Sequence, residues 1–145
     1  RQWMDEEYEV TCLHTVAGRV LLEDRPSTAR FVPVALGHHA WYDGSAHGYP
    51  EEYKRLECPS RQMVDVVSLI DWIENVTHSA QSYTGVSMTF DDAVAEAIDM
   101  EGRQFSPMLT ARLRDPAVVE RIRLALEEGR QEAYRQMYGS EQCGG

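Results

Sequence analysis

The segment from residue 60 to 79 constrains the fold more than any other part of the chain, because apolar side chains occupy almost every side of it. A helix that is apolar all round lies at the centre of a protein, where other elements cover it. The sequence therefore predicts a buried, central helix over this segment. Its apolar residues are Met63, Val66, Val67, Leu69, Ile70, Trp72, Ile73 and Val76.

Two helical patterns precede this segment. Residues 4–24 place apolar side chains at helical spacing, and acidic residues stand near the start, where the helix dipole favours them. Residues 26–39 continue the pattern, with a kink or a slightly late start expected at Pro33. The stripe of the first helix that we expect to face the core consists of Val10, Leu13, Ala17, Val20 and Leu21.

Three further helices are predicted after residue 88. Thr89 is a good cap for a helix that reaches about Met100, and Pro107 starts a short helix to Arg114. Asp115 caps the last helix, which carries apolar residues on one side. No segment alternates as a strand would.

The predicted fold class is therefore all-α, a compact bundle of about six helices. A chain of 145 residues fits one domain with one core. We expect a single helical domain over 1–138 and a disordered tail over 139–145. The chain opens without methionine and enters a helical pattern almost at once, as a piece of a longer protein would.

Charge and cysteine usage narrow the function. The net charge of -10 argues against binding a nucleic-acid polymer, because no basic surface would meet the phosphate backbone. A phosphate substrate is still compatible if bound metal ions supply positive charge locally.

No apolar run reaches about 20 residues, so no membrane insertion is expected. Three cysteines, far apart and without a CxxC pattern, favour a reducing, cytoplasmic location.

Three polar features interrupt apolar patterns. His14 stands on the stripe of the first helix, the pair His38-His39 ends the second, and Asp71 lies inside the most apolar helix. A buried carboxylate is costly unless it is paired or coordinated. Together, these residues have the composition of a nitrogen-and-oxygen metal site.

Each feature also has a structural explanation. His14 could be a core histidine that hydrogen-bonds a carbonyl, and one of the paired histidines could interact with the last carbonyls of its helix. Neighbouring helical residues point about 100° apart, so one ion rarely takes both histidines, whereas two ions could take one each. Asp71 could pair with an arginine from a neighbouring helix. The residues alone leave both explanations open.

The order of these residues resembles the second half of an HD-GYP domain, a family of bacterial metal-dependent phosphohydrolases. A double histidine with a Gly-Tyr-Pro downstream is fairly specific, and the match covers residues 5 to about 114 in the right order. The stretches that carry it are His14-Thr15-Val16-Ala17-Gly18, His38-His39-Ala40-Trp41-Tyr42-Asp43-Gly44-Ser45, Gly48-Tyr49-Pro50, Leu69-Ile70-Asp71-Trp72-Ile73-Glu74, Thr89-Phe90-Asp91-Asp92-Ala93-Val94 and Gly102-Arg103-Gln104-Phe105-Ser106-Pro107.

The resemblance implies a helical bundle of the HD-domain type that holds two divalent metal ions, iron or manganese. It implies that His14, His38, His39 and Asp71 are the ligands from this chain. It further implies a cyclic di-GMP phosphodiesterase, a hydrolase in which a metal-bridging hydroxide attacks the phosphorus. No side chain is assigned a direct catalytic role.

Some family elements are missing, and they leave a second hypothesis open. No histidine is followed by aspartate, Ala40 replaces a glutamate, and Ala46-His47 is inserted before Gly-Tyr-Pro. The basic substrate-contacting stretch is replaced by Ala80–Thr84, which has no basic residue. The chain is thus either part of a phosphodiesterase or a divergent, catalytically weak domain that acts as a signalling or protein-binding module.

The connection over 40–59 is long and rich in Gly, Tyr and Pro, and such connections are often functional. The resemblance implies that its Gly-Tyr-Pro loop binds other signalling domains. The alternative is that Tyr49 packs back on the bundle and anchors the loop. The residues assigned to partner binding are Asp43, Gly44, Gly48, Tyr49 and Pro50.

Overall fold

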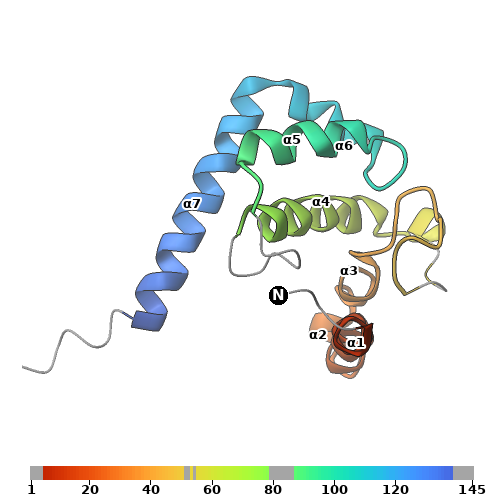
Figure 1. Ribbon diagram of the computed structural model, residues 1–145. Coiled ribbons are helices and arrows are strands. Elements are labelled where there is room, and N and C mark those ends of the chain that lie inside the picture. The colour runs from red at the N-terminus through yellow and green to blue at the C-terminus, as the bar shows by residue number, and fades with distance from the viewer. Residues whose placement is uncertain (1–4, 51–52, 54, 79–86, 139–145) are drawn as a thin grey trace, which may run out of the picture.

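The computed structural model describes residues 5–50, 53, 55–78 and 87–138, and within them the fold is all-α, as predicted. Seven α-helices and two short 3-10 helices follow one another, and the described residues contain no β-strand (Figure 1). The stretch 80–84 and the tail 139–145, about which the sequence made predictions, lie outside the described residues. The helices are α1 Asp5–Glu23, α2 Pro26–Ala29, α3 Val32–Gly37, η1 Arg55–Glu57, α4 Arg61–Thr77, α5 Phe90–Asp99, α6 Pro107–Thr110, η2 Arg112–Arg114 and α7 Pro116–Tyr138.

Local capping explains where α5 and α7 begin. The Thr89 hydroxyl accepts a hydrogen bond from the Asp92 backbone N–H (3.1 Å), which satisfies one of the free donors of the first turn of α5. The carboxylate of Asp115 accepts from the Ala117 N–H (2.9 Å) at the start of α7. Both starts confirm the sequence prediction.

The helix predicted over 26–39 is divided into two short helices, and the late start expected at Pro33 corresponds to the beginning of α3 at Val32. Proline has no N–H and its ring clashes with the preceding turn, so Pro33 is tolerated near the start of a helix but not inside one. The chain therefore leaves α2 at Ala29 and begins α3 at Val32. Since α3 ends at Gly37, the two histidines follow it in a turn rather than in a helix.

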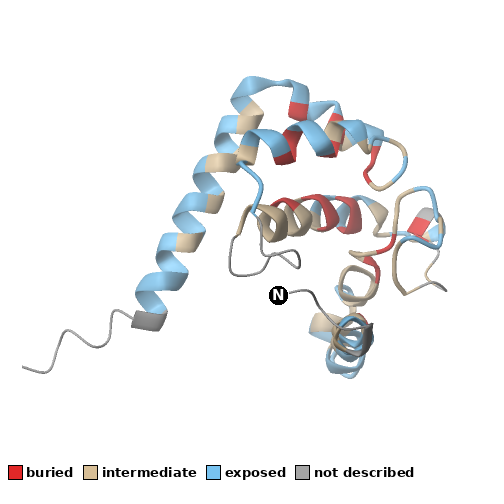
Figure 2. Cartoon of the chain, viewed as in Figure 1, coloured by how far each residue is buried: buried red, intermediate tan, exposed pale blue. Residues whose placement is uncertain are grey.

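The core lies between α4 and α5, where buried residues gather in Figure 2, and partly buried residues of α7 pack against it. α4 packs against α3 on one side and α5 on the other, as a central helix should. Its burial is less complete than predicted, since Met63 and Val66 are exposed. The buried members of the core cluster are Leu69, Ile73, Val94, Ala97, Phe105 and Leu113.

The predicted inward stripe of α1 is wrong. Leu13 is 59% exposed and Leu21 is 76% exposed, and the other three members of that stripe are also exposed. The buried side of α1 is instead its small-residue side, where Thr15 is fully buried. A Cβ added at Gly18 would lie 3.1 Å from the Ala35 Cβ, so α1 and α3 approach closely at this glycine. The close approach, rather than the aliphatic stripe, orients α1.

Among the described helices, none is both long enough and apolar enough to cross a membrane.

A buried ion pair fixes the connection between α3 and α4. Arg55 Nε donates to Asp65 Oδ1 (2.8 Å), and both side chains are almost completely buried. Arg55 Nη1 donates to the Ala40 carbonyl and to Ser68 Oγ. One guanidinium thereby ties the backbone just after the two histidines to two positions on α4.

We expect Arg55→Met to lower the free energy of unfolding by about 3–5 kcal/mol, because the buried Asp65 carboxylate loses its hydrogen-bonded partner and keeps only the partly exposed Arg61 at 3.8 Å. Urea unfolding followed by far-UV circular dichroism measures the change. Arg61→Met is the matched control: Arg61 also faces Asp65, at 3.8 Å, but is partly exposed, so its loss should cost about 1 kcal/mol or less. Equal losses in the two variants would contradict the role given to Arg55.

Candidate metal centre

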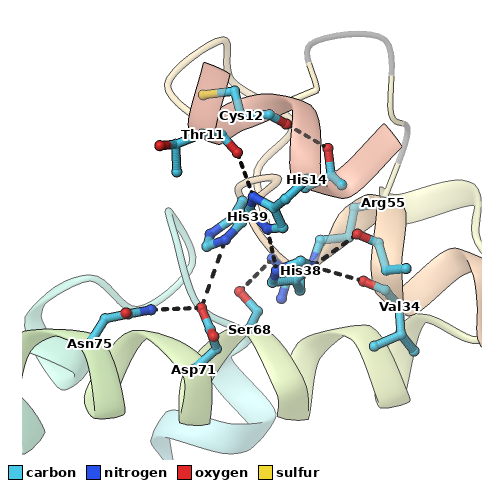
Figure 3. A network of polar contacts seen from close by, with 12 residues as sticks. Thr11, Cys12, His14, Val34, His38, His39, Arg55, Ser68, Asp71 and Asn75 are labelled. Carbon is cyan, nitrogen blue, oxygen red and sulfur yellow. Dashed lines mark hydrogen bonds and ion pairs between the residues drawn. The ribbon is translucent and has the colours of Figure 1, made fainter. Parts of the chain in front are cut away.

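Three histidines from two parts of the chain form one cluster. His14 comes from α1, and His38 and His39 come from the turn after α3. Each offers one ring nitrogen such that these nitrogens all lie within 4.8 Å of one another. Figure 3 shows the three imidazoles turned toward one another above α4. The structure thus brings together three of the four residues that the resemblance assigns to metal ions.

His38 and His39 lie side by side at the C-terminal end of α3, where the His38 N–H still donates to the Val34 carbonyl (3.2 Å). Neighbouring residues inside a helix would point about 100° apart. In the turn, the rings of His38 and His39 have centroids 4.1 Å apart. The carbonyl of Ala40, held by Arg55, fixes the backbone on the far side of the pair.

Backbone carbonyls set the tautomers of two of the histidines. His14 Nδ1 lies 2.6 Å from the Thr11 carbonyl oxygen, and His38 Nδ1 lies 3.0 Å from the Val34 carbonyl oxygen. A carbonyl oxygen only accepts, so both Nδ1 atoms carry the hydrogen. In the neutral ring, Nε2 is then left with a free lone pair. Histidines that bind metals are commonly oriented in this way.

The two lone pairs face each other. His14 Nε2 and His38 Nε2 are 3.2 Å apart, and with both Nδ1 atoms protonated neither Nε2 of the neutral rings has a hydrogen to donate. The arrangement is repulsive unless a proton or a cation lies between them. Two nitrogens bound to one tetrahedral ion, each about 2.0–2.1 Å from it, stand about 3.3 Å apart. The observed separation fits that geometry.

Burial lowers the pKa of two of the three histidines. Burial, followed by the positive charges of His38 and His14, lowers the pKa of His39 to about 3. Burial also lowers the pKa of His38, against the opposing effect of Asp71. Neutral imidazole is the form that binds a metal ion, so little proton release would be needed at neutral pH.

Asp71 stands beside the cluster, outside the group of nitrogens. Its Oδ2 lies 3.8 Å from His39 Nε2 and accepts a hydrogen bond from Asn75 Nδ2 (3.0 Å). Its side chain is 36% exposed, so the sequence prediction of a buried carboxylate is wrong in degree. Partial burial still raises its pKa, although the charges of His38 and His14 act in the opposite direction.

A cavity of about 390 Å³ opens next to the cluster. Its walls are largely aromatic, and among the described residues that line it there is no lysine or arginine. Sequence reasoning did not assign Tyr8, Trp41, His47 or Trp72 to a site. For His47 the signal was present, since it belongs to the two-residue insertion before Gly-Tyr-Pro. The lining residues are Tyr8, His38, His39, Trp41, His47, Tyr49, Ser68, Asp71, Trp72, Asn75, Val76, Met88 and Gln104.

The Gly-Tyr-Pro loop packs back on the histidines. The Tyr49 ring stacks on His39, with centroids 4.5 Å apart and an interplanar angle of 26°, and meets His14 edge-on at 6.1 Å. Gly48 lies so close to the Trp41 N–H and the His39 carbonyl that a Cβ would overlap them. This arrangement corresponds to the alternative in which Tyr49 anchors the loop.

The other residues assigned to partner binding lie at the ends of the loop. Asp43 and Gly44 form an exposed turn, in which the Asp43 carboxylate accepts from the Ser45 N–H (2.8 Å) and Gly44 adopts a φ of 74°. Pro50 is half-buried and follows Tyr49 through a cis peptide bond. Binding of a signalling domain by this loop stays a prediction.

In metal-free protein, we expect the free energy of unfolding to fall as the pH falls from about 6.5 toward 3. His39 holds its proton less tightly when folded, so the unfolded chain binds more protons across this window. Between pH 7 and pH 4, a His39→Gln variant should lose less unfolding free energy than the wild type, by about 3 kcal/mol at most. Urea unfolding in EDTA at each pH measures it. His47→Gln, which removes an exposed imidazole outside the cluster, is the matched control.

Comparison with known proteins yields no match to a protein-family model, to a curated protein or to a solved structure.

Proposed function

We propose that His14, His38, His39 and Asp71 bind a divalent transition-metal ion, and that the chain is part of a metal-dependent phosphohydrolase resembling the HD-GYP cyclic di-GMP phosphodiesterases. The main support is the pair of facing Nε2 lone pairs, 3.2 Å apart, because a cation resolves their repulsion. The ordered motifs of the sequence favour phosphodiester hydrolysis as the reaction.

The donor set agrees with such an ion. Imidazole suits iron and zinc, carboxylate suits manganese and magnesium, and a mixed set suits a transition metal that accepts both. The histidine cluster accounts for one ion, with Asp71 within reach of it beside His39. The resemblance favours iron or manganese and a second ion, which would need ligands besides these four residues.

The chain's own residues would orient the metal-binding imidazoles and form the cavity for a substrate. The carbonyls of Thr11 and Val34 hold the two imidazoles in orientation, and Tyr49 covers the face of the third. The neighbouring cavity has the volume of a small-molecule site and borders both His39 and Asp71. An ion bound there would activate water and offset charge on the phosphate oxygens.

A second candidate function is a catalytically weak signalling or protein-binding module. It is favoured by the absence of lysine and arginine from the described cavity wall, because phosphodiester substrates are anionic. The alanine at position 40 points the same way, since the family has a glutamate there. Both candidate functions include the bound metal ion. They differ in the rate at which the chain hydrolyses a phosphodiester.

Metal content tests the shared part of the proposal. Protein stripped with EDTA, incubated with Mn²⁺ and desalted should retain about one ion per chain by elemental analysis. His38→Ala should weaken the affinity by more than about tenfold, as judged by competition with a chromogenic chelator. At 100 times the dissociation constant, the ion should add about 2.7 kcal/mol to the free energy of unfolding.

The control is His78→Ala, because His78 follows α4 and does not belong to the histidine cluster. Its manganese affinity should equal that of the wild type. Equal retention of manganese by wild type and His38→Ala would refute the metal centre.

Turnover separates the two candidate functions. We expect manganese-loaded chain 1–145 to hydrolyse cyclic di-GMP slowly or not at all, because it has no His-Asp pair to complete the ligand set. Chromatography of the nucleotide products measures the rate. Fast hydrolysis that His38→Ala abolishes would show that the four ligands suffice.

A further inference from the structure

His47 lies in the wall of the cavity beside the histidine cluster without being one of its members. It is the second residue of the Ala46-His47 insertion, so the motif resemblance assigns it no role. Its imidazole is exposed, and its ring lies against that of Trp41, with centroids 4.8 Å apart. An added residue that lines a candidate site calls for a separate explanation.

The backbone that follows His47 is held in place. Gly48, the next residue, packs against the Trp41 N–H and the His39 carbonyl. The Tyr49 N–H then donates to the same His39 carbonyl (3.3 Å). Arg103 lies 5.8 Å from the centroid of the Trp41 ring, so that ring is itself supported. The imidazole of His47 is therefore set at the cavity wall by its neighbours.

The charges around the cavity indicate what His47 could bind. A divalent ion held by three neutral imidazoles and one carboxylate leaves a net charge of about one, too little for a phosphate dianion. Outside the proposed ligands, His47 is the one described residue of the cavity wall whose side chain can carry positive charge. Two of the neutral polar groups are already engaged, since Ser68 accepts from Arg55 and Asn75 donates to Asp71.

We propose that His47 is a ligand-binding residue that donates a hydrogen bond to a phosphate oxygen of a group bound at the metal centre. The inference rests on the proposed metal site and adds to it the second contact with the phosphate. An imidazole has at least one N–H in either protonation state, so the donor is present throughout the neutral range. The ring contact with Trp41 restricts the ring without occupying both nitrogens.

Binding of inorganic phosphate to the manganese-loaded full chain tests this role by isothermal titration calorimetry. We expect His47→Phe to weaken phosphate binding about tenfold, because it keeps the ring contact with Trp41 and removes the N–H donor. His47→Ala should weaken it at least as much. His78→Phe, outside this cavity, should leave the affinity unchanged, and manganese content should be equal in all four proteins.

The outcomes separate this inference from the metal centre. If His47→Phe binds phosphate as tightly as the wild type, or if manganese-loaded wild type binds no phosphate, the assignment of His47 is overturned and the metal centre stands. If the wild type retains no manganese, both are overturned. An equal loss of phosphate affinity in His47→Phe and His78→Phe would also overturn the assignment of His47.

Discussion

The buried Arg55–Asp65 ion pair is the interaction on which the arrangement of the candidate site depends. The guanidinium joins three parts of the chain: the 3-10 helix that carries it, α4, and the Ala40 carbonyl next to the paired histidines. A buried ion pair of this kind contributes little net stability, since desolvation offsets the attraction. The ion pair instead fixes the position of the chain. A shift of the Ala40 carbonyl would take an acceptor away from the buried Arg55 guanidinium.

A second constraint, which is electrostatic, acts on the ring nitrogens of the histidine cluster. Carbonyl acceptors direct the Nδ1 hydrogens of His14 and His38 outward, so their lone pairs turn inward and oppose each other. Burial disfavours protonation of His38, one of the two rings whose Nε2 atoms face each other. The facing lone pairs therefore arise from backbone acceptors rather than from any acidic residue.

The parts of the fold that the sequence predicted well are those decided locally. The Thr89 cap and the apolar run of α4 act within a few residues, so their patterns are visible in the letters. The orientation of α1 was predicted wrongly because it depends on the contact between Gly18 and Ala35, which are far apart in sequence. The burial of Asp65 depends likewise on Arg55, and no periodicity identifies such a partner.

In the candidate site, too, some features were predictable from the sequence and others depend on contacts between distant parts of the chain. The order of histidines and Asp71 along the chain was enough to nominate the ligands, and the fold brings the three histidines together. The order did not show that the paired rings lie 4.1 Å apart at the end of α3, because that depends on how the chain turns there. The aromatic cavity wall was also missed, since Tyr8, Trp41 and Trp72 come from separate segments.

The small-residue contact between α1 and α3 has a consequence for the order in which the molecule opens. α1 buries little aliphatic surface, so its docking rests on close backbone approach around Thr15 and Gly18 rather than on a large hydrophobic contact. Regions with few buried apolar contacts open at lower free energy than the core. His14 moves with α1, whereas the paired histidines stay with α4, so undocking of α1 would separate His14 from the other two histidines. An ion held across this seam would act as a cross-link, and amide hydrogen exchange in α1 would report its occupancy.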